Sequence, residues 1–273
     1  MSKSSNNLIG VFDSGLGGLS VLKNFLKILP GYHYLYLGDT ARVPYGDKSP
    51  EIIYKYTTQA VDFLFKKGCR LVIIACNTAS AQALRKLQQE WLPKKYPNRR
   101  VLGVIRPLAE ATAKYNFKKV GIIGTKATIT SGSYKREIND LNSKIKVYSQ
   151  AAPLLVPLIE EGRVQKEETR LILKSYLKPL QQKKIDGLIL ACTHYPHLQK
   201  AIKKIVGPKV AVPDTGKIVA LSLKEYLERH PELEIESKKT TCEFFTTDQP
   251  RLFKSLAEKF LGRKIKKISQ IKL

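Results

Sequence analysis

The sequence predicts an α/β protein with mainly parallel sheets arranged in two lobes, and three observations lead to this fold class. Strand-like apolar runs alternate with helix-like segments along nearly all of the 273 residues. Runs such as "RLVIIAC" and "DGLILAC" are almost wholly apolar, as parallel strands covered on both faces must be. Residues 8–18 resemble 119–129, and residues 71–79 resemble 187–195. These paired similarities suggest two pseudo-symmetric three-layer lobes of a common plan.

Periodicity and caps place the elements of the first part of the chain. Strands are expected at "NLIGVF", "YHYLYLGD" and "RLVIIAC". Leu19, Leu22, Leu26 and Leu29 recur at helical spacing, so a helix is expected between the first two strands. The segment "SPEIIYKYTTQAVDFLFKKG" opens with a serine cap and a proline and ends at glycine, which predicts a second helix. A third helix is expected over "SAQALRKLQQEW".

The same alternation predicts the rest of the chain. Strands are expected at "RRVLGVI", "KKVGIIGT", "KIKVYSQ", "DGLILAC" and "CEFFTTD". Helix-like sequence follows each of them, including a helix that starts at Pro196, one that runs through Tyr226 and a last one over "RLFKSLAEKFLG". Because helices connect successive strands, the strands of each sheet are expected to run parallel.

Composition and charge limit the functional classes. The chain has 48 basic and 23 acidic residues, a net charge of +25, which would suit nucleic acid. Scattered lysine pairs without interleaved aromatic residues favour a lysine-biased surface instead. No apolar run approaches the ~18 residues of a membrane span, and the polar start "MSKSSNNLIG" does not resemble a signal peptide. Four cysteines without C-x-x-C spacing predict reduced thiols in the cytoplasm.

Reactive residues are expected at the ends of several strands. Ligands of open parallel sheets bind beyond the carboxyl ends of the strands. Asp13, Cys76, Thr125 and Cys192 all occupy this position in the expected elements. A cleft between the two lobes would therefore bring the two cysteines face to face. Cys69 and Cys242 are interpreted as packing residues.

Two rival interpretations of these strand ends are weaker. The loop "GLGGLS" after the first strand approximates a dinucleotide fingerprint, with Asp39 at the end of the second strand. However, the third glycine is replaced by serine and Asp13 would repel a pyrophosphate. Cys192, His194 and His197 are spaced as in a metal cluster, but no second cluster supplies the fourth ligand of a structural zinc. Neither a bound metal nor a dinucleotide is expected.

Paired thiols suit the inversion of a carbon centre. A cysteine between a strand and a helix can ionise near neutral pH, and inversion requires a base on one face of the carbon and an acid on the other. Two identical groups, one ionised and one protonated, could run such a reaction in both directions. Neighbouring polar side chains could hold an amino acid and tune the thiols. These are Asp13, Asn77 and Thr78 near one cysteine, and Thr193 and His194 near the other. The alternative is that both cysteines are ordinary buried core residues, and these residues alone do not decide between the two interpretations.

Seven segments together resemble the cofactor-independent aspartate/glutamate racemase family. They are "IGVFDSGLGGLSVL", "YLGDTARVPYGDKS", "ACNTASA", "VGIIGTKATITSGSY", "VPLIEEG", "ACTHYPHL" and "FFTTD", in family order over residues 9 to 248. The resemblance implies interconversion of L-glutamate and D-glutamate without pyridoxal phosphate or metal, to supply D-glutamate for peptidoglycan. It also implies a cytoplasmic homodimer that does not bind membranes. Aspartate or another amino acid as substrate, or nucleic acid bound by the basic surface, are the alternatives.

The resemblance further implies lobes and residue roles. The first lobe would comprise residues 1–98 and 209–273, the second residues 99–208, with the active site in the cleft between them. Cys76 would remove the α-proton of D-glutamate and Cys192 that of L-glutamate. Asp13 would assist Cys76, His194 and Glu160 would assist Cys192, and Asp39 would play a supporting part. The expected substrate-binding residues are Asp13, Ser14, Tyr45, Gly46, Asn77, Thr78, Thr193 and His194.

The chain departs from the family pattern at a few positions. The family usually has glycine before the second cysteine, where this chain has Ala191. An added methyl next to the site would change the shape of the pocket. Arg106 and Leu108 stand where family members often carry an acidic residue and glycine. The basic surplus is not a family feature either, so the subunit interface is not carried over from the resemblance.

Overall fold

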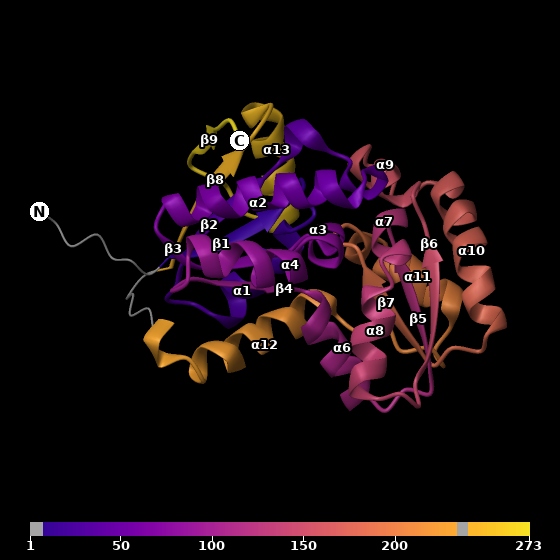
Figure 1. Cartoon of the computed structure of the whole chain (residues 1–273). Helices are drawn as coiled ribbons and strands as arrows, with labels where there is room; N and C mark the ends of the chain where they lie inside the picture. Colours follow the sequence, from indigo (N-terminus) through magenta and orange to yellow (C-terminus); the bar gives the residue numbers. More distant parts are fainter. Residues whose placement is uncertain (1–7, 234–239) are drawn as a thin grey trace, which may run out of the picture.

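The computed structural model describes residues 8–233 and 240–273, which form two parallel sheets with helices on both faces of each (Figure 1). This confirms the predicted fold class. The first residues of the chain, on which the expectation about a signal peptide depends, lie outside the described part. No helix of the described residues is long and apolar enough to cross a bilayer.

The first sheet has six parallel strands in the order β4-β3-β1-β2-β8-β9. Their bounds are β1 Leu8–Asp13, β2 His33–Gly38, β3 Cys69–Ile74, β4 Arg100–Gly103, β8 Thr241–Thr246 and β9 Ile268–Gln270. The central strand β1 pairs with both β2 and β3, and Phe12 lies opposite Leu37 on one side and Ile74 on the other. Because all strands are parallel, their carboxyl ends lie at one edge of the sheet.

Helices cover both faces of this sheet, as the apolar strands require. Their bounds are α1 Leu19–Ile28, α12 Thr215–Glu228 and α13 Pro250–Leu261 on one face, and α2 Pro50–Lys66 and α3 Asn77–Gln82 on the other. Phe25 of α1 and Phe253 of α13 belong to the same apolar cluster as Val11. Leu64 of α2 belongs to a second cluster with Phe12. Val11 and Phe12 point to opposite faces, as successive strand residues do.

The second sheet has three parallel strands in the order β6-β5-β7. Its strands are β5 Lys119–Gly124, β6 Lys146–Ala151 and β7 Gly187–Ala191. The helices around it are α6 Ile105–Lys114, α8 Ser133–Leu141, α9 Leu155–Glu160, α10 Glu167–Gln182 and α11 Gln199–Val206. Ile138 of α8 clusters with Ile122 on one face. Leu177 of α10 clusters with Leu190 on the other. The second sheet is thus also the middle layer of three.

One apolar cluster extends across both sheets and joins them. It includes Val11 of β1 and Ile122 of β5, together with residues of α1, α6, α8 and α12. Helices α6 and α12 pack against each other at this junction (Figure 1). The repeated segments also occupy equivalent places, because β1 lies beside β3 in the first sheet and β5 beside β7 in the second. The carboxyl ends of these four strands therefore lie near the junction.

Three features of the fold differ from the sequence-based expectation. The third helix starts earlier, at Asn77, because the Cys76 sulfur accepts a hydrogen bond from the Ala79 amide and caps it. After α3 this helix continues as shorter pieces rather than one rod. The basic C-terminal segment contributes an unpredicted strand, β9, which pairs with β8. Finally, β4 pairs with β3, so residues 100–103 belong to the first sheet.

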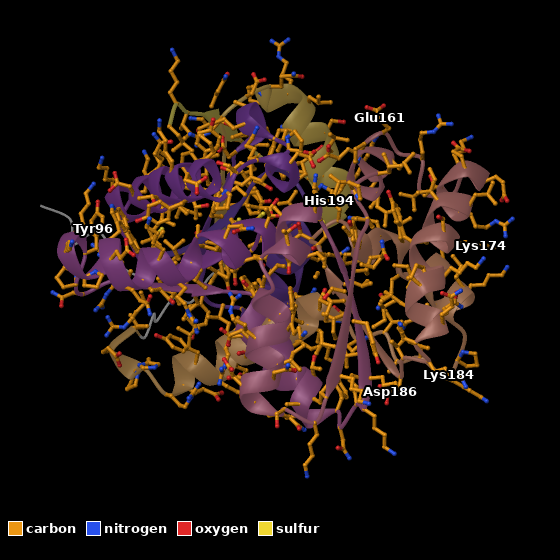
Figure 2. The ribbon with its side chains drawn as sticks, turned by 45° about the vertical axis from the view of Figure 1, so that its right-hand side comes forward. Tyr96, Glu161, Lys174, Lys184, Asp186 and His194 are labelled. Carbon is orange, nitrogen blue, oxygen red and sulfur yellow. The ribbon has the colours of Figure 1, made fainter. Side chains whose placement is uncertain are left out.

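Short elements complete the chain. They are η1 Thr40–Arg42, η2 Tyr45–Asp47, η4 Tyr195–Leu198, η5 Pro231–Leu233, α4 Leu84–Lys86, a π-helical turn Leu87–Trp91, α5 Leu92–Lys95 and α7 Lys126–Thr130. Lysines such as Lys174 and Lys184 extend outward from the second lobe (Figure 2).

Candidate active site

A cavity of about 240 Å³ lies where the carboxyl ends of the central strands of both sheets meet. Cys76 follows β3 of the first sheet, and Cys192 follows β7 of the second. Both sulfur-bearing residues line this cavity, one from each lobe. The two sheets thus each contribute a thiol to the wall of one cavity.

The predicted site residues are gathered at this cavity, with one exception. Those that line it are Ser14, Tyr45, Gly46, Cys76, Asn77, Thr78, Glu160, Cys192, Thr193 and His194. Asp13 is not among the lining residues, because its side chain is fully buried behind them. Cys69 and Cys242, interpreted as packing residues, also lie outside the lining.

Burial keeps the thiol of Cys76 protonated. The Ser14 hydroxyl lies 3.3 Å from the Cys76 sulfur, and the Ala79 amide donates to that sulfur at 3.5 Å. Loss of solvent raises the pKa of Cys76 to about 12, the negative charge of Asp13 adds to this rise, and the hydrogen bond with Ser14 opposes it. In the ligand-free protein this sulfur therefore carries a proton that it can donate.

Asp13 connects the two lobes behind the cavity wall. Its Oδ2 accepts a hydrogen bond from the Gly15 amide at 3.0 Å, and its Oδ1 accepts one from the Thr193 hydroxyl at 3.3 Å. Burial raises the pKa of Asp13, while the charge of His194 and these hydrogen bonds oppose the rise. A carboxyl group with a raised pKa can hold or pass on a proton next to Cys76.

His194 carries a positive charge beside Cys192. Its Nδ1 lies 3.9 Å from the Cys192 sulfur, and its Nε2 lies 3.0 Å from Glu160 Oε1. Burial disfavours the charged imidazole, but the interactions with Cys192 and Glu160 outweigh burial and raise the pKa of His194 to about 10. Figure 2 shows His194 in the interior between the lobes, with Glu161 further out toward solvent. The imidazolium therefore lies directly beside the Cys192 sulfur.

The two walls of the cavity are therefore chemically unequal. Burial and the charge of Asp13 favour the neutral form of Cys76, whereas Cys192 lies beside a cation. An acid on one wall and a base on the other is the arrangement that proton transfer at opposite faces of a carbon requires. After one such transfer the protonation states are exchanged, and the reverse reaction can follow.

The polar groups of Tyr45 and Asp39 are engaged by other groups of the protein rather than open to a ligand. Tyr45 lines the cavity, but its hydroxyl donates to Asp39 Oδ2 at 2.5 Å. Asp39 also accepts from Arg42 Nε at 2.6 Å and from the Thr247 hydroxyl at 2.9 Å. Asp39 is fully buried and does not line the cavity. It holds the segment 40–47 that forms one side of the mouth.

A close approach of the backbone at Gly17 fixes the lobes near His194. A Cβ atom at Gly17 would lie 2.3 Å from Thr193 Oγ1 and 2.5 Å from His194 Nδ1. The next turn adds a second contact, because the Ser20 hydroxyl donates a hydrogen bond to the Thr193 carbonyl oxygen at 3.0 Å. Glycine is therefore required here for space. The loop that the sequence offered as a dinucleotide fingerprint instead packs against the Cys192 wall.

Several lining residues were not predicted. Thr125 follows β5 as Cys76 follows β3, and its hydroxyl lies 2.8 Å from that of Thr78 and 2.9 Å from that of Thr128. The sequence predicts Thr125 at a strand end, but a threonine at a strand end can serve many purposes, so no role in the site was predicted for it. Lys126, Asp47 and Glu161 also line the cavity. All three lie within segments that carry the family resemblance, but the resemblance implied no role for any of them.

The departures from the family pattern lie away from the cavity. Ala191 is fully buried in the apolar cluster shared by the two lobes and does not line the cavity. Leu108 is buried in the same cluster. Arg106 lies beside a different cavity of about 350 Å³ and pairs there with Glu110 at 2.8 Å and Glu137 at 3.1 Å. That cavity is larger, but neither cysteine of the strand ends lines it.

The metal cluster considered from the sequence does not assemble among the described residues. Within residues 8–233 and 240–273, no group of three or more His, Cys, Asp or Glu side chains is arranged to hold a metal ion. His197 instead packs against the ring of Phe260, with 4.2 Å between ring centroids.

A two-lobed parallel α/β fold with a thiol on each wall of one cavity defines an enzyme that moves protons at opposite faces of a carbon, which is the class of racemases and epimerases. Comparison with known proteins gives the family. The sequence model of the Asp/Glu/hydantoin racemase family matches residues 9–223, and this chain belongs to that family.

Known proteins are similar to this chain over nearly its full length. The chain is 40% identical to glutamate racemase from Geobacter metallireducens over 97% of this chain and 96% of the relative. Among solved structures it is similar to glutamate racemase isoform RacE1 from Bacillus anthracis, with a TM-score of 0.91, 35% identity and 98% of both chains covered. It is also similar to glutamate racemase from Francisella tularensis in complex with D-glutamate, with a TM-score of 0.89, 37% identity and the same coverage.

Replacement of either wall cysteine tests the assignment of the thiols. We expect Cys76→Ala and Cys192→Ala each to lower kcat at least ~100-fold, because each change removes one of two proton-transfer groups. Racemisation is measured by polarimetry, and folding by circular dichroism. Cys242→Ala is the control and should keep near-normal activity. A folded Cys76→Ala or Cys192→Ala protein with normal kcat would contradict the two-thiol assignment.

Enlargement of Gly17 tests the contact between the lobes. The Cβ of Gly17→Ala would overlap Thr193 and His194, so we expect kcat to fall ~10-fold or more while the fold remains. In Gly15→Ala the added carbon would meet only the Val43 side chain, at 3.4 Å, and the loss should be much smaller. Equal effects of the two substitutions on kcat would show that the close approach is unimportant.

Proposed function

We propose that this protein interconverts L-glutamate and D-glutamate by proton transfer between two cysteines, without a cofactor. The observation that carries this proposal is the pair of cysteines that line one cavity, one from each lobe. The substrate is chosen because the relatives that match nearly the whole chain are glutamate racemases. In the cell the product would be D-glutamate for peptidoglycan.

In the proposed reaction the α-carbon of glutamate loses one proton and gains another on its opposite face. Cys192, as a thiolate beside protonated His194, removes the α-proton of L-glutamate. Cys76 then donates its own proton to the opposite face of the carbanion, which gives D-glutamate, a Cys76 thiolate and a Cys192 thiol. The reverse reaction starts from that second state. Glu160 keeps His194 charged through its bond at 3.0 Å, and Asp13 exchanges protons with Cys76.

Neutral hydrogen-bond donors at the strand ends would stabilise the carbanion. The Asn77 side-chain oxygen accepts a hydrogen bond from the Tyr134 hydroxyl at 2.5 Å. This bond orients the Asn77 amide and leaves its N–H groups to donate to a substrate carboxylate. Ser14, Thr78 and Thr193 line the same cavity. Donors held in a space with little water stabilise developing charge without acting as competing bases.

The lobes that frame the cavity are also part of the proposal. The first would comprise the N-terminal part and residues 209–273, and the second the segment between, with the active site in the cleft. The pairing of β4 with β3 moves the first boundary from residue 98 to about residue 104. A cytoplasmic homodimer follows from the family resemblance and completes the proposal.

Deuterium exchange tests the reaction and its substrate. We expect the purified protein, in D2O with a metal chelator and no added cofactor, to abolish the optical rotation of L-glutamate. Deuterium should enter the α-position, since each transfer passes through a thiol that exchanges with solvent. L-aspartate should be turned over with lower kcat/KM. Failure of both signals with glutamate, or higher kcat/KM for aspartate, would contradict the proposed substrate.

A further inference from the structure

We propose that Lys126 binds the distal carboxylate of the substrate and thereby selects an acidic amino acid over a neutral one. This inference rests on the proposed function, because it assigns one more residue to the same cavity. Lys126 is the first residue of α7, directly after β5 and Thr125. It lines the cavity and is exposed at its mouth. None of the residues assigned above to substrate binding is a lysine or arginine, and the one cation among them, His194, is engaged by Cys192 and Glu160.

Lys126 lies on a helix that faces the other lobe across the cavity. Helix α7 packs against η2, the turn of the first lobe that contains Tyr45 and Gly46. This approach is close, since a Cβ at Gly46 would lie 3.0 Å from the Thr125 Cβ. A ligand that extends from the thiols toward solvent must pass this point. The flexible four-carbon stem of lysine can follow such a ligand.

The charged residues around the mouth offer a negative ligand no other lysine or arginine. Asp47, Glu160 and Glu161 line the cavity, and Lys126 is the one lysine or arginine among its described lining residues. The charge of His194 is already engaged by Cys192 and Glu160. Glutamate brings two carboxylates and one ammonium. Without Lys126 its distal carboxylate would meet three carboxylates and no free cation.

Lys126 is free to take this role. Within the described part of the chain its ammonium has no ion pair or hydrogen bond. Apolar side chains also line the cavity, namely Val43, Pro44, Pro153, Val156 and Pro157. A ligand carboxylate enclosed by them would be less screened by water than one on an open surface. The lysine would thus gain its first strong partner when substrate binds.

This role predicts an effect on binding rather than on proton transfer. The distal carboxylate takes no part in the reaction and keeps its charge throughout. An interaction made equally in the ground state and the transition state changes KM and leaves kcat nearly unaltered. The contact is electrostatic and near the surface, so its contribution should shrink as salt is added.

The test compares Lys126→Met with Lys135→Met, a control at an exposed lysine of α8 that does not line the cavity. For Lys126→Met we expect KM for L-glutamate to rise ~10-fold at low salt, with kcat within ~3-fold of the wild type. Lys126→Arg should restore most of the affinity. L-glutamine, whose distal group is neutral, should inhibit Lys126→Met and wild type with similar inhibition constants. Lys135→Met should match the wild type.

The outcomes separate this inference from the proposed function. Unchanged KM for glutamate in Lys126→Met, with an active wild type, overturns the role of Lys126 and leaves the racemase proposal intact. A fall in kcat without a rise in KM also overturns it, because that result assigns Lys126 to the chemical step. A wild-type protein that does not turn over glutamate overturns the proposed function and this inference together.

Discussion

The position of His194 between the Cys192 sulfur and the Glu160 carboxylate is the interaction on which the rest of the site depends. Burial alone would leave this imidazole neutral, yet its two partners raise its pKa to about 10. A cation therefore lies beside Cys192, whereas burial and the charge of Asp13 raise the pKa of Cys76 to about 12. The same type of side chain can therefore act as base on one side and acid on the other.

The fold creates this inequality by joining two parallel sheets at their carboxyl ends. Each sheet delivers a cysteine just past a buried strand, where a helix begins and backbone groups are available as donors. The contacts across the junction are short and specific. The Thr193 hydroxyl donates to Asp13, and the Ser20 hydroxyl donates to the Thr193 carbonyl oxygen. Gly17, which has no side chain, leaves room for Thr193 and His194. A shift of one lobe would therefore disturb the pKa values on both walls at once.

The sequence predicted the parts of this site that depend on local pattern. Apolar runs that end in Ala-Cys placed Cys76 and Cys192 at strand ends, and the motifs supplied Asp13, His194 and Glu160. What sequence could not predict depends on tertiary contacts. The Tyr45 hydroxyl is taken by Asp39, and β9 exists only because β8 offers an edge to a lysine-rich segment. Lys126 lies in one of the quoted segments, but its proposed role depends on the acidic residues that line the cavity with it, which only the fold brings together.

The most direct test of this account is the protonation state of His194. The chain has four histidines, so 15N-histidine NMR from about pH 5 to about pH 11 can follow each ring. The account predicts an imidazolium at neutral pH that loses its proton near pH 10. Because this pKa is raised in the folded state, its contribution to stability is present below about pH 6.5 and disappears as the pH rises through 10. Glu160→Gln should lower the titration point. A neutral His194 at pH 7 in the wild type would contradict the unequal walls.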